Sequence, residues 1–158
     1  MTHSHRQTLL NSAEETSDFA RAIAAHLAPG DTILLEGGVG AGKTHFARSL
    51  IQHMLEVAED VPSPTFTLVQ TYDGPKCEIW HADLYRLSNP DEVIELGLTE
   101  AFDDAICLVE WPDRLAELQP ENALTISLAM MPEEGVRQMS LSWTDETWAE
   151  KLKGLAVA

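Results

Sequence analysis

The 158-residue chain carries 26 acidic and 10 basic side chains, which gives a formal net charge of −16. Its length fits one domain, no apolar run approaches the about 20 residues of a membrane span, and the isolated Cys77 and Cys107 fit a reducing cytoplasm. The Lys and Arg residues are scattered, which argues against direct binding of RNA or DNA, so the acidity serves either solubility or docking to a basic protein partner.

The N-terminal part predicts a short tail followed by a helix. Residues 1–8 lack the charged and then apolar layout of a signal peptide, and we expect them to be flexible. Ser12 is a predicted helix N-cap with acidic residues in the turn that follows it, and apolar residues recur at helical spacing over residues 19–27. The Pro-Gly pair at residues 29–30 is expected to end this helix.

A phosphate-binding loop comes next, between a predicted strand at residues 32–35 and a predicted helix at residues 45–55. Its glycines let backbone N–H groups approach phosphate oxygens, and the start of the helix favours an anion. Lys43 is expected to reach the β- and γ-phosphates, and the Thr44 hydroxyl to bind Mg²⁺. The chain is therefore predicted to bind a nucleoside triphosphate through Gly37, Gly38, Val39, Gly40, Ala41, Gly42, Lys43, Thr44 and His45.

Beyond this helix the chain continues through a loop and two predicted strands. Ser63 and Thr65 lie in a proline-stiffened segment that either folds over the γ-phosphate or simply connects two elements. Strands are predicted at residues 66–72 and 78–84, with a turn between them. His81, inside the second strand, is interpreted as a strand residue that makes one hydrogen bond and not as a metal ligand.

Two carboxylates follow predicted strands and are candidates for the rest of the site. Asp83 ends the strand just described, and Glu110 follows the apolar run at residues 105–109. Ligands lie beyond the C-terminal ends of strands in such sheets, and hydrolysis needs an acidic group near Mg²⁺ and a group that orients water. The alternative for each carboxylate is a solvated surface position. Trp111 is either a core residue or a cover over the site.

The C-terminal half adds further mixed elements. Helices are predicted to start at Pro90 and to span residues 112–118, strands to occupy residues 124–128 and 139–143, and a final helix to lie within residues 144–158. Helices and strands that alternate around a phosphate-binding loop predict a single α/β domain of the P-loop NTPase type over the whole chain. We expect a central mixed sheet with parallel strands near the nucleotide and with flanking helices.

Four motifs together resemble one known family. They are the phosphate-binding loop, Ser-Pro-Thr-Phe-Thr-Leu at residues 63–68, His-Ala-Asp-Leu-Tyr-Arg-Leu at residues 81–87, and Leu-Val-Glu-Trp-Pro at residues 108–112. The first is shared by many NTPases, but its combination with the other three is similar to TsaE, formerly called YjeE. The resemblance covers roughly residues 10–143 in the right order and spacing.

The resemblance implies a small bacterial ATPase that uses ATP and Mg²⁺ and hydrolyses slowly. TsaE proteins associate with the TsaD–TsaB pair, in which TsaD transfers the threonylcarbamoyl group to the tRNA adenosine beside the anticodon. The ATP cycle would reset that complex between turnovers. The chain would accordingly meet tRNA only through a TsaD–TsaB-like partner, and it would need neither DNA nor a membrane.

The matched motifs also imply roles for individual residues. Lys43, Asp83 and Glu110 would be the catalytic residues. Thr44 and Glu110 would contact Mg²⁺ directly or through water, and Asp83 would support the metal or the attacking water. Trp111 would matter for activity.

Contacts with the nucleotide outside the loop, and departures from the family pattern, come from other positions. The segment around Thr16 resembles the family's N-terminus, which places this residue near the adenine, and Arg137 is a further candidate for a nucleotide contact. Family members usually carry Asp at the position of Gly38, Thr at that of His45 and an aromatic residue at that of Ala82. The loss of a carboxylate at Gly38 would change the rate and not the function.

Two other functions stay open. A small-molecule kinase uses the same loop, but it closes an Arg-bearing lid over the phosphates. Between residues 92 and 121 the only basic residue is Arg114, and no lid segment is recognisable. The other alternative is a nucleotide-dependent binding module whose hydrolysis is incidental. In that case the loss of Glu110 would leave the biological role intact.

Overall fold

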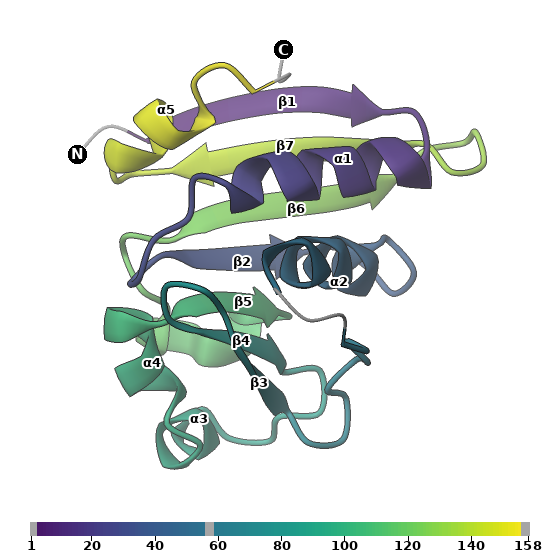
Figure 1. The fold of residues 1–158 in the computed structure, drawn as a ribbon. Coiled ribbons are helices and arrows are strands. Elements are labelled where there is room, and N and C mark those ends of the chain that lie inside the picture. Colours follow the sequence, from purple (N-terminus) through teal and green to yellow (C-terminus); the bar gives the residue numbers. More distant parts are fainter. Residues whose placement is uncertain (1–2, 56–58, 156–158) are drawn as a thin grey trace.

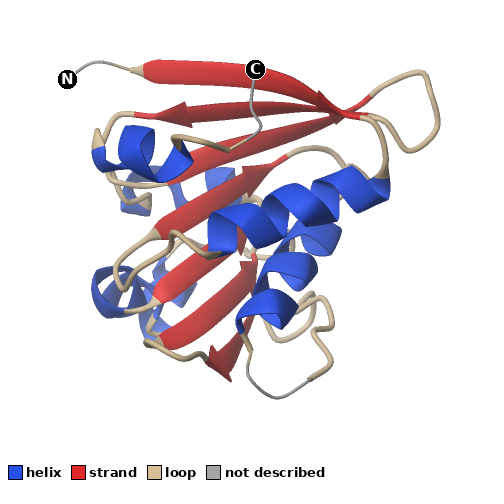
Figure 2. Ribbon diagram, turned by 45° about the horizontal axis from the view of Figure 1, so that its top comes forward, coloured by secondary structure: helices blue, strands red, loops and turns tan. Residues whose placement is uncertain are grey.

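The computed structural model describes residues 3–55 and 59–155. In this part of the chain seven strands form one sheet in the order β1-β7-β6-β2-β5-β4-β3, with helices on both faces (Figures 1 and 2). The strands are β1 (Ser4–Leu10), β2 (Thr32–Glu36), β3 (Val69–Asp73), β4 (Glu78–Asp83), β5 (Ile106–Glu110), β6 (Leu124–Met130) and β7 (Arg137–Trp143). The helices are α1 (Ala13–Ala24), α2 (Lys43–Met54), α3 (Asp91–Glu95), α4 (Leu98–Asp104), the 3₁₀ helix η1 (Pro112–Leu118) and α5 (Thr147–Leu152).

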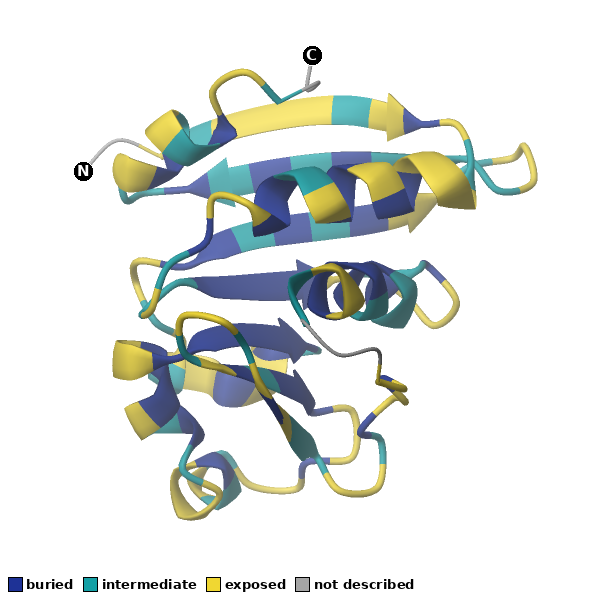
Figure 3. Ribbon diagram, viewed as in Figure 1, coloured by how far each residue is buried: buried dark blue, intermediate teal, exposed yellow. Residues whose placement is uncertain are grey.

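The centre of the sheet is parallel, as the sequence predicted. Strand β2 pairs in parallel with β5 and β6, and β5 pairs in parallel with β4, while β1, β7 and β3 add antiparallel edges. The C-terminal ends of β2, β5 and β4 therefore lie side by side at one edge of the sheet. All five residues of β5 are buried (Figure 3), as expected for a central strand that is covered on both faces.

Two apolar clusters fill the space between the sheet and its helices. Helices α1, α2 and α5 pack on one face, and the rings of Phe19 and Phe46 lie 6.3 Å apart between α1 and α2. Helices α3, α4 and η1 cover β4, β5 and β2 on the other face. Alternate residues of β5 enter opposite clusters: Leu108 faces α2, and Val109 faces α4. None of the helices in the described ranges is long and apolar enough to cross a bilayer.

The N-terminal segment differs from the prediction of a flexible tail over residues 1–8, of which residues 1–2 lie outside the described residues. Ser4–Leu10 forms the edge strand β1, which pairs antiparallel with the whole of β7. On its outer face Gln7 donates a hydrogen bond to the Ser140 hydroxyl over 3.3 Å. Strand β1 has only one paired edge and much of it faces solvent, so its side chains are mainly polar. Its sequence therefore lacks the alternation of apolar and polar residues from which a strand can be predicted.

Smaller differences concern the lengths of elements. The strand predicted from residue 66 begins at Val69, and Phe66 lies in a turn with 84% of its surface exposed. Helix α4 was not predicted, and η1 is a 3₁₀ helix. The C-terminal helix is confined to α5, which buries Trp148 and Leu152, and residues 156–158 of the predicted helix lie outside the described residues.

Candidate active site

The phosphate-binding loop connects β2 to α2 at the C-terminal edge of the sheet. Gly37 packs so closely under β6 that a Cβ atom would lie 2.5 Å from the Leu128 carbonyl oxygen. Gly42 starts α2 in the left-handed conformation (φ 106°), so the first N–H groups of the helix point into the loop. From β7, Arg137 donates hydrogen bonds to the carbonyls of Ala41 over 2.9 Å and of Gly40 over 3.3 Å. The loop is thus held by two neighbouring strands.

Lys43 is almost fully buried within this loop. Its ammonium group donates to the carbonyls of Gly37 and Gly38 and lies 3.4 Å from the centre of the Trp111 ring. Burial lowers the pKa of Lys43, although the nearby carboxylates of Glu110, Asp83 and Asp113 oppose that shift. The amine is therefore held against the carbonyls of its own loop, at the wall of the cavity that the loop borders.

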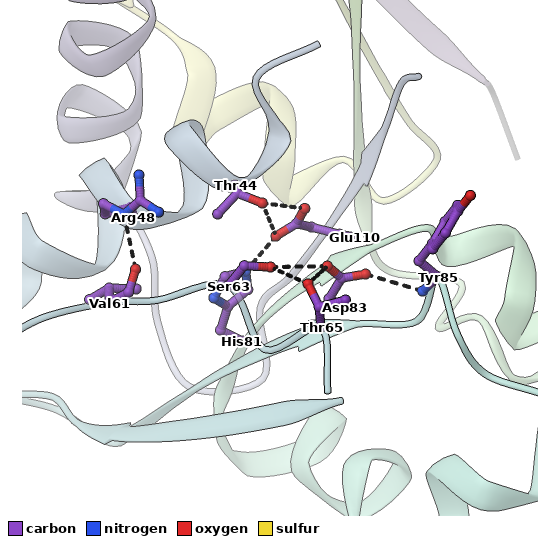
Figure 4. A network of polar contacts seen from close by, with 9 residues as sticks. All are labelled: Thr44, Arg48, Val61, Ser63, Thr65, His81, Asp83, Tyr85 and Glu110. Carbon is purple, nitrogen blue, oxygen red and sulfur yellow. Dashed lines mark hydrogen bonds and ion pairs between the residues drawn. The ribbon is translucent and has the colours of Figure 1, made fainter. Parts of the chain in front are cut away.

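Glu110 joins the loop to the sheet. This side chain is 2% exposed at the end of β5, and both of its carboxylate oxygens accept from the Thr44 hydroxyl, over 2.8 and 3.1 Å. The Oε2 atom also contacts Nε2 of the buried His81 at 2.7 Å (Figure 4). Residues Glu110 and Thr44 were both predicted as metal-site residues, and the fold brings them into direct contact.

Asp83 organises the second half of the site. It pairs with Glu110 in the β4–β5 register and is 5% exposed. Its Oδ2 atom accepts from the hydroxyls of Ser63 over 3.2 Å and Thr65 over 3.4 Å, and Oδ1 accepts from the Tyr85 N–H over 3.1 Å (Figure 4). The proline-stiffened segment that carries Ser63 and Thr65 therefore lies against the site.

A cavity of about 480 Å³ lies between these groups. Its walls are the phosphate-binding loop, the segment of Ser63 and Thr65, and the ends of β4 and β5. Over the described residues no group of three or more His, Cys, Asp and Glu side chains is arranged to hold a metal ion. Thr44 with the two carboxylates nevertheless fits Mg²⁺, because this ion is commonly bound by one or two carboxylates together with phosphates and water.

A second hollow of about 230 Å³ lies along the loop toward α1. Thr16 and Arg137 both line it, with Ala13, Gly135 and residues 40–42 of the loop. His45 lines this hollow as well as the larger cavity. The two residues predicted to contact the nucleotide outside the loop are thus placed together, apart from Asp83 and Glu110. In this structure, Arg137 is engaged with loop carbonyls.

Sequence reasoning undervalued two residues of the site. His81 was predicted to be a strand histidine that makes one hydrogen bond, which is confirmed, but its partner, Glu110, was not predicted. Its signal was its place two residues before Asp83, which puts both side chains on the same face of β4. Tyr85 was not singled out, but it lines the cavity, and its ring centre lies 4.9 Å from that of Trp111. Trp111 itself is in the left-handed region (φ 59°), where a tryptophan is strained.

The chain is similar in sequence to known proteins over most of its length. The chain is 43% identical to a tRNA threonylcarbamoyladenosine biosynthesis protein TsaE of Rickettsia bellii over 81% of this chain and 89% of the relative. It is 40% identical to the Bacillus subtilis protein of the same name, over 72% of this chain and 70% of that one.

Similarity also extends to a solved structure and to a family description. The crystal structure of Bacillus subtilis YdiB superposes with a TM-score of 0.81 at 28% identity, covering 99% of this chain and 97% of that one. A sequence model described as "Threonylcarbamoyl adenosine biosynthesis protein TsaE" matches residues 10–139, most of the chain. The chain therefore belongs to the TsaE family.

Proposed function

We propose that this protein is a Mg²⁺-dependent ATPase that acts in threonylcarbamoyladenosine modification of tRNA through a TsaD–TsaB-like pair. One observation carries the catalytic part of the proposal. Two carboxylates, Asp83 and Glu110, end adjacent parallel strands and face the phosphate-binding loop, and Glu110 is bonded to Thr44. The pathway part rests on the similarity to relatives that are named as threonylcarbamoyladenosine biosynthesis proteins. The free thiols of Cys77 and Cys107 are in keeping with a cytoplasmic location.

Each part of the site has its own role in this proposal. Backbone N–H groups of the loop, from Gly38 to His45, bind the phosphates, and Lys43 neutralises their charge. Mg²⁺ would be held near Thr44, Glu110 and Asp83, where it would offset charge on the transferred phosphoryl group. The two carboxylates also orient the attacking water. Ser63 and Thr65, already bonded to Asp83, lie where the γ-phosphate would enter.

The second hollow is proposed to receive the base end of the nucleotide, because it adjoins the loop on the side away from the carboxylates. Thr16 would lie beside the adenine. Arg137 contributes mainly by fixing the loop, since its guanidinium group is bonded to two loop carbonyls. The ring of Trp111, which lines the cavity, covers the Lys43 amine.

ATP hydrolysis by the purified chain, measured alone and with a TsaD–TsaB pair and tRNA, tests this proposal. We expect a slow basal rate that changes when the pair is added. A rate indifferent to the pair, with no co-elution in any nucleotide state, would contradict the role in tRNA modification. Phosphate transfer to a nucleoside or small alcohol would instead favour a kinase.

Substitution of Glu110 separates an ATPase from a binding module with incidental hydrolysis. We expect Glu110→Ala and the closer mimic Glu110→Gln to keep ATP binding and association with the pair. Turnover should fall by about 100-fold or more, because a preorganised group at the reacting centre is lost. If either variant, with hydrolysis abolished, still supports repeated rounds of tRNA modification, binding and not hydrolysis is the function.

A further inference from the structure

His81 makes a contact that a structural core histidine does not need. Its side chain is fully buried, and its Nε2 atom lies 2.7 Å from Oε2 of Glu110. Glu110 is itself 2% exposed, so neither group is compensated by bulk water. Because an ionised carboxylate only accepts hydrogen bonds, Nε2 must carry the proton of this contact. Within the described residues the other ring nitrogen, Nδ1, has no hydrogen-bond partner.

The unpaired Nδ1 atom indicates why a histidine occupies position 81. An apolar side chain at this strand position would bury no polar atom, whereas a buried nitrogen without a partner costs free energy. The contact between Nε2 and Glu110 is the one polar contact of the His81 side chain across the described part of the chain. The imidazole is therefore retained for the carboxylate that it holds.

The sheet explains how the contact is built. In the β4–β5 register His81 lies beside Leu108 and Asp83 beside Glu110, so the imidazole reaches diagonally to the carboxylate at the end of the next strand. Side chains alternate along both strands, which puts His81, Asp83 and Glu110 on the face that α2 covers. Thr44, at the start of α2, meets the same carboxylate from the other side (Figure 4).

We infer that His81 is a positioning residue, which fixes the Glu110 carboxylate against Thr44 and so sets the affinity of the site for Mg²⁺. This inference rests on the proposed function. His81 lies on a central strand and not on a loop, and groups carried by such rigid elements orient their neighbours most accurately. Partners that orient a ligand to a metal typically change its affinity by about 10–100-fold when they are removed.

Three variants test the inference. His81→Leu removes the hydrogen-bond donor to Glu110 and places an apolar side chain in the core. His81→Gln offers an amide N–H that can reach Oε2 of Glu110. Ile79→Val serves as the matched control, because Ile79 is buried on the same face of β4 and has no polar side-chain atom that could bond to Glu110.

The measurement is the Mg²⁺ concentration at half-saturation, read from the fluorescence of a bound ADP analogue, with Mg²⁺-free binding and thermal unfolding recorded in parallel. We expect His81→Leu to raise this concentration by about 10–100-fold and to leave Mg²⁺-free binding within about twofold. His81→Gln should return it to within about threefold of the unaltered protein, and Ile79→Val should not change it. In a Glu110→Gln background, His81→Leu should add no further shift.

Three results would overturn the inference: a folded His81→Leu protein with unaltered Mg²⁺ response, a His81→Gln protein as impaired as His81→Leu, or an additive shift in the Glu110→Gln background. If His81→Leu does not fold, His81→Asn replaces it in the test, because the shorter Asn amide does not reach the carboxylate. An Asn variant with the same Mg²⁺ concentration at half-saturation as the Gln variant would then count against positioning. An unaltered protein whose nucleotide binding ignores Mg²⁺ would remove the proposed function and this inference together.

Discussion

Adjacent glycines at the start of the phosphate-binding loop face different constraints, although the sequence pattern does not distinguish them. A Cβ atom at Gly37 would lie 2.5 Å from the backbone oxygen of Leu128 and 3.1 Å from the Ala41 side chain. At Gly38 a Cβ atom would meet nothing within 4 Å. Close packing against β6 therefore requires glycine at the first position, while the second is open to a side chain.

The pair Gly37→Ala and Gly38→Ala tests this distinction. Gly37→Ala should lower the free energy of unfolding by about 1–3 kcal/mol, because β6 or the loop must move, and should weaken ATP binding as the loop shifts. Gly38→Ala should change stability by no more than about 0.5 kcal/mol. Urea unfolding and nucleotide titration measure both effects. Equal behaviour of the two variants would show that the contact with Leu128 is not what fixes the loop.

Elements differ in how far the sequence could predict them. Strands β2 and β5, and the carboxylate that ends β5, were predicted because a fully apolar run that ends in an acidic residue is a local pattern. Strand β1 was missed because its order comes from pairing with β7, more than a hundred positions later in the chain. The contact of His81 with Glu110 was missed for the same reason, since it depends on the register of two strands. Helix α4 was missed because it is short and begins after a left-handed Gly97.

The packing of the C-terminal helix α5 on the rest of the domain can be tested at Trp148. Trp148 is 1% exposed within the apolar cluster that α1 and α2 also enter, and its Nε1 donates to the Asn122 carbonyl over 2.7 Å. Trp148→Ala should cost about 3–5 kcal/mol of unfolding free energy through the cavity it leaves. Trp148→Phe should cost less, since it fills more of the space. Thermal and urea unfolding measure the difference, and limited proteolysis reports whether the tail is released. A Trp148→Ala protein as stable as the unaltered one would mean that α5 docks elsewhere.

At the scale of the whole molecule, most of the negative charge lies away from the site. Asp83 and Glu110 are the only buried acidic side chains in the described ranges, so the surplus of the −16 formal charge lies on the surface. Around the cavity, by contrast, basic groups meet aromatic rings: Lys43 over Trp111 at 3.4 Å and Arg114 near Tyr85 at 5.9 Å from the ring centre. In the cavity the Lys43 amine and the N–H groups at the start of α2 offset the two carboxylates, whereas the surplus negative charge of the surface disfavours contact with polyanions.

Salt dependence decides between the two explanations of the surface charge, solubility and docking to a basic partner. We expect docking, so the rate of association with a TsaD–TsaB pair should fall by about tenfold between roughly 50 and 500 mM NaCl, because salt screens the attraction that steers the encounter. The dissociation rate should change much less. Stopped-flow or surface-plasmon measurements at several salt concentrations give both rates, and nucleotide affinity at each concentration is the control for the site itself. An association rate independent of salt would assign the charge to solubility and leave the contact with the pair to apolar and local polar groups.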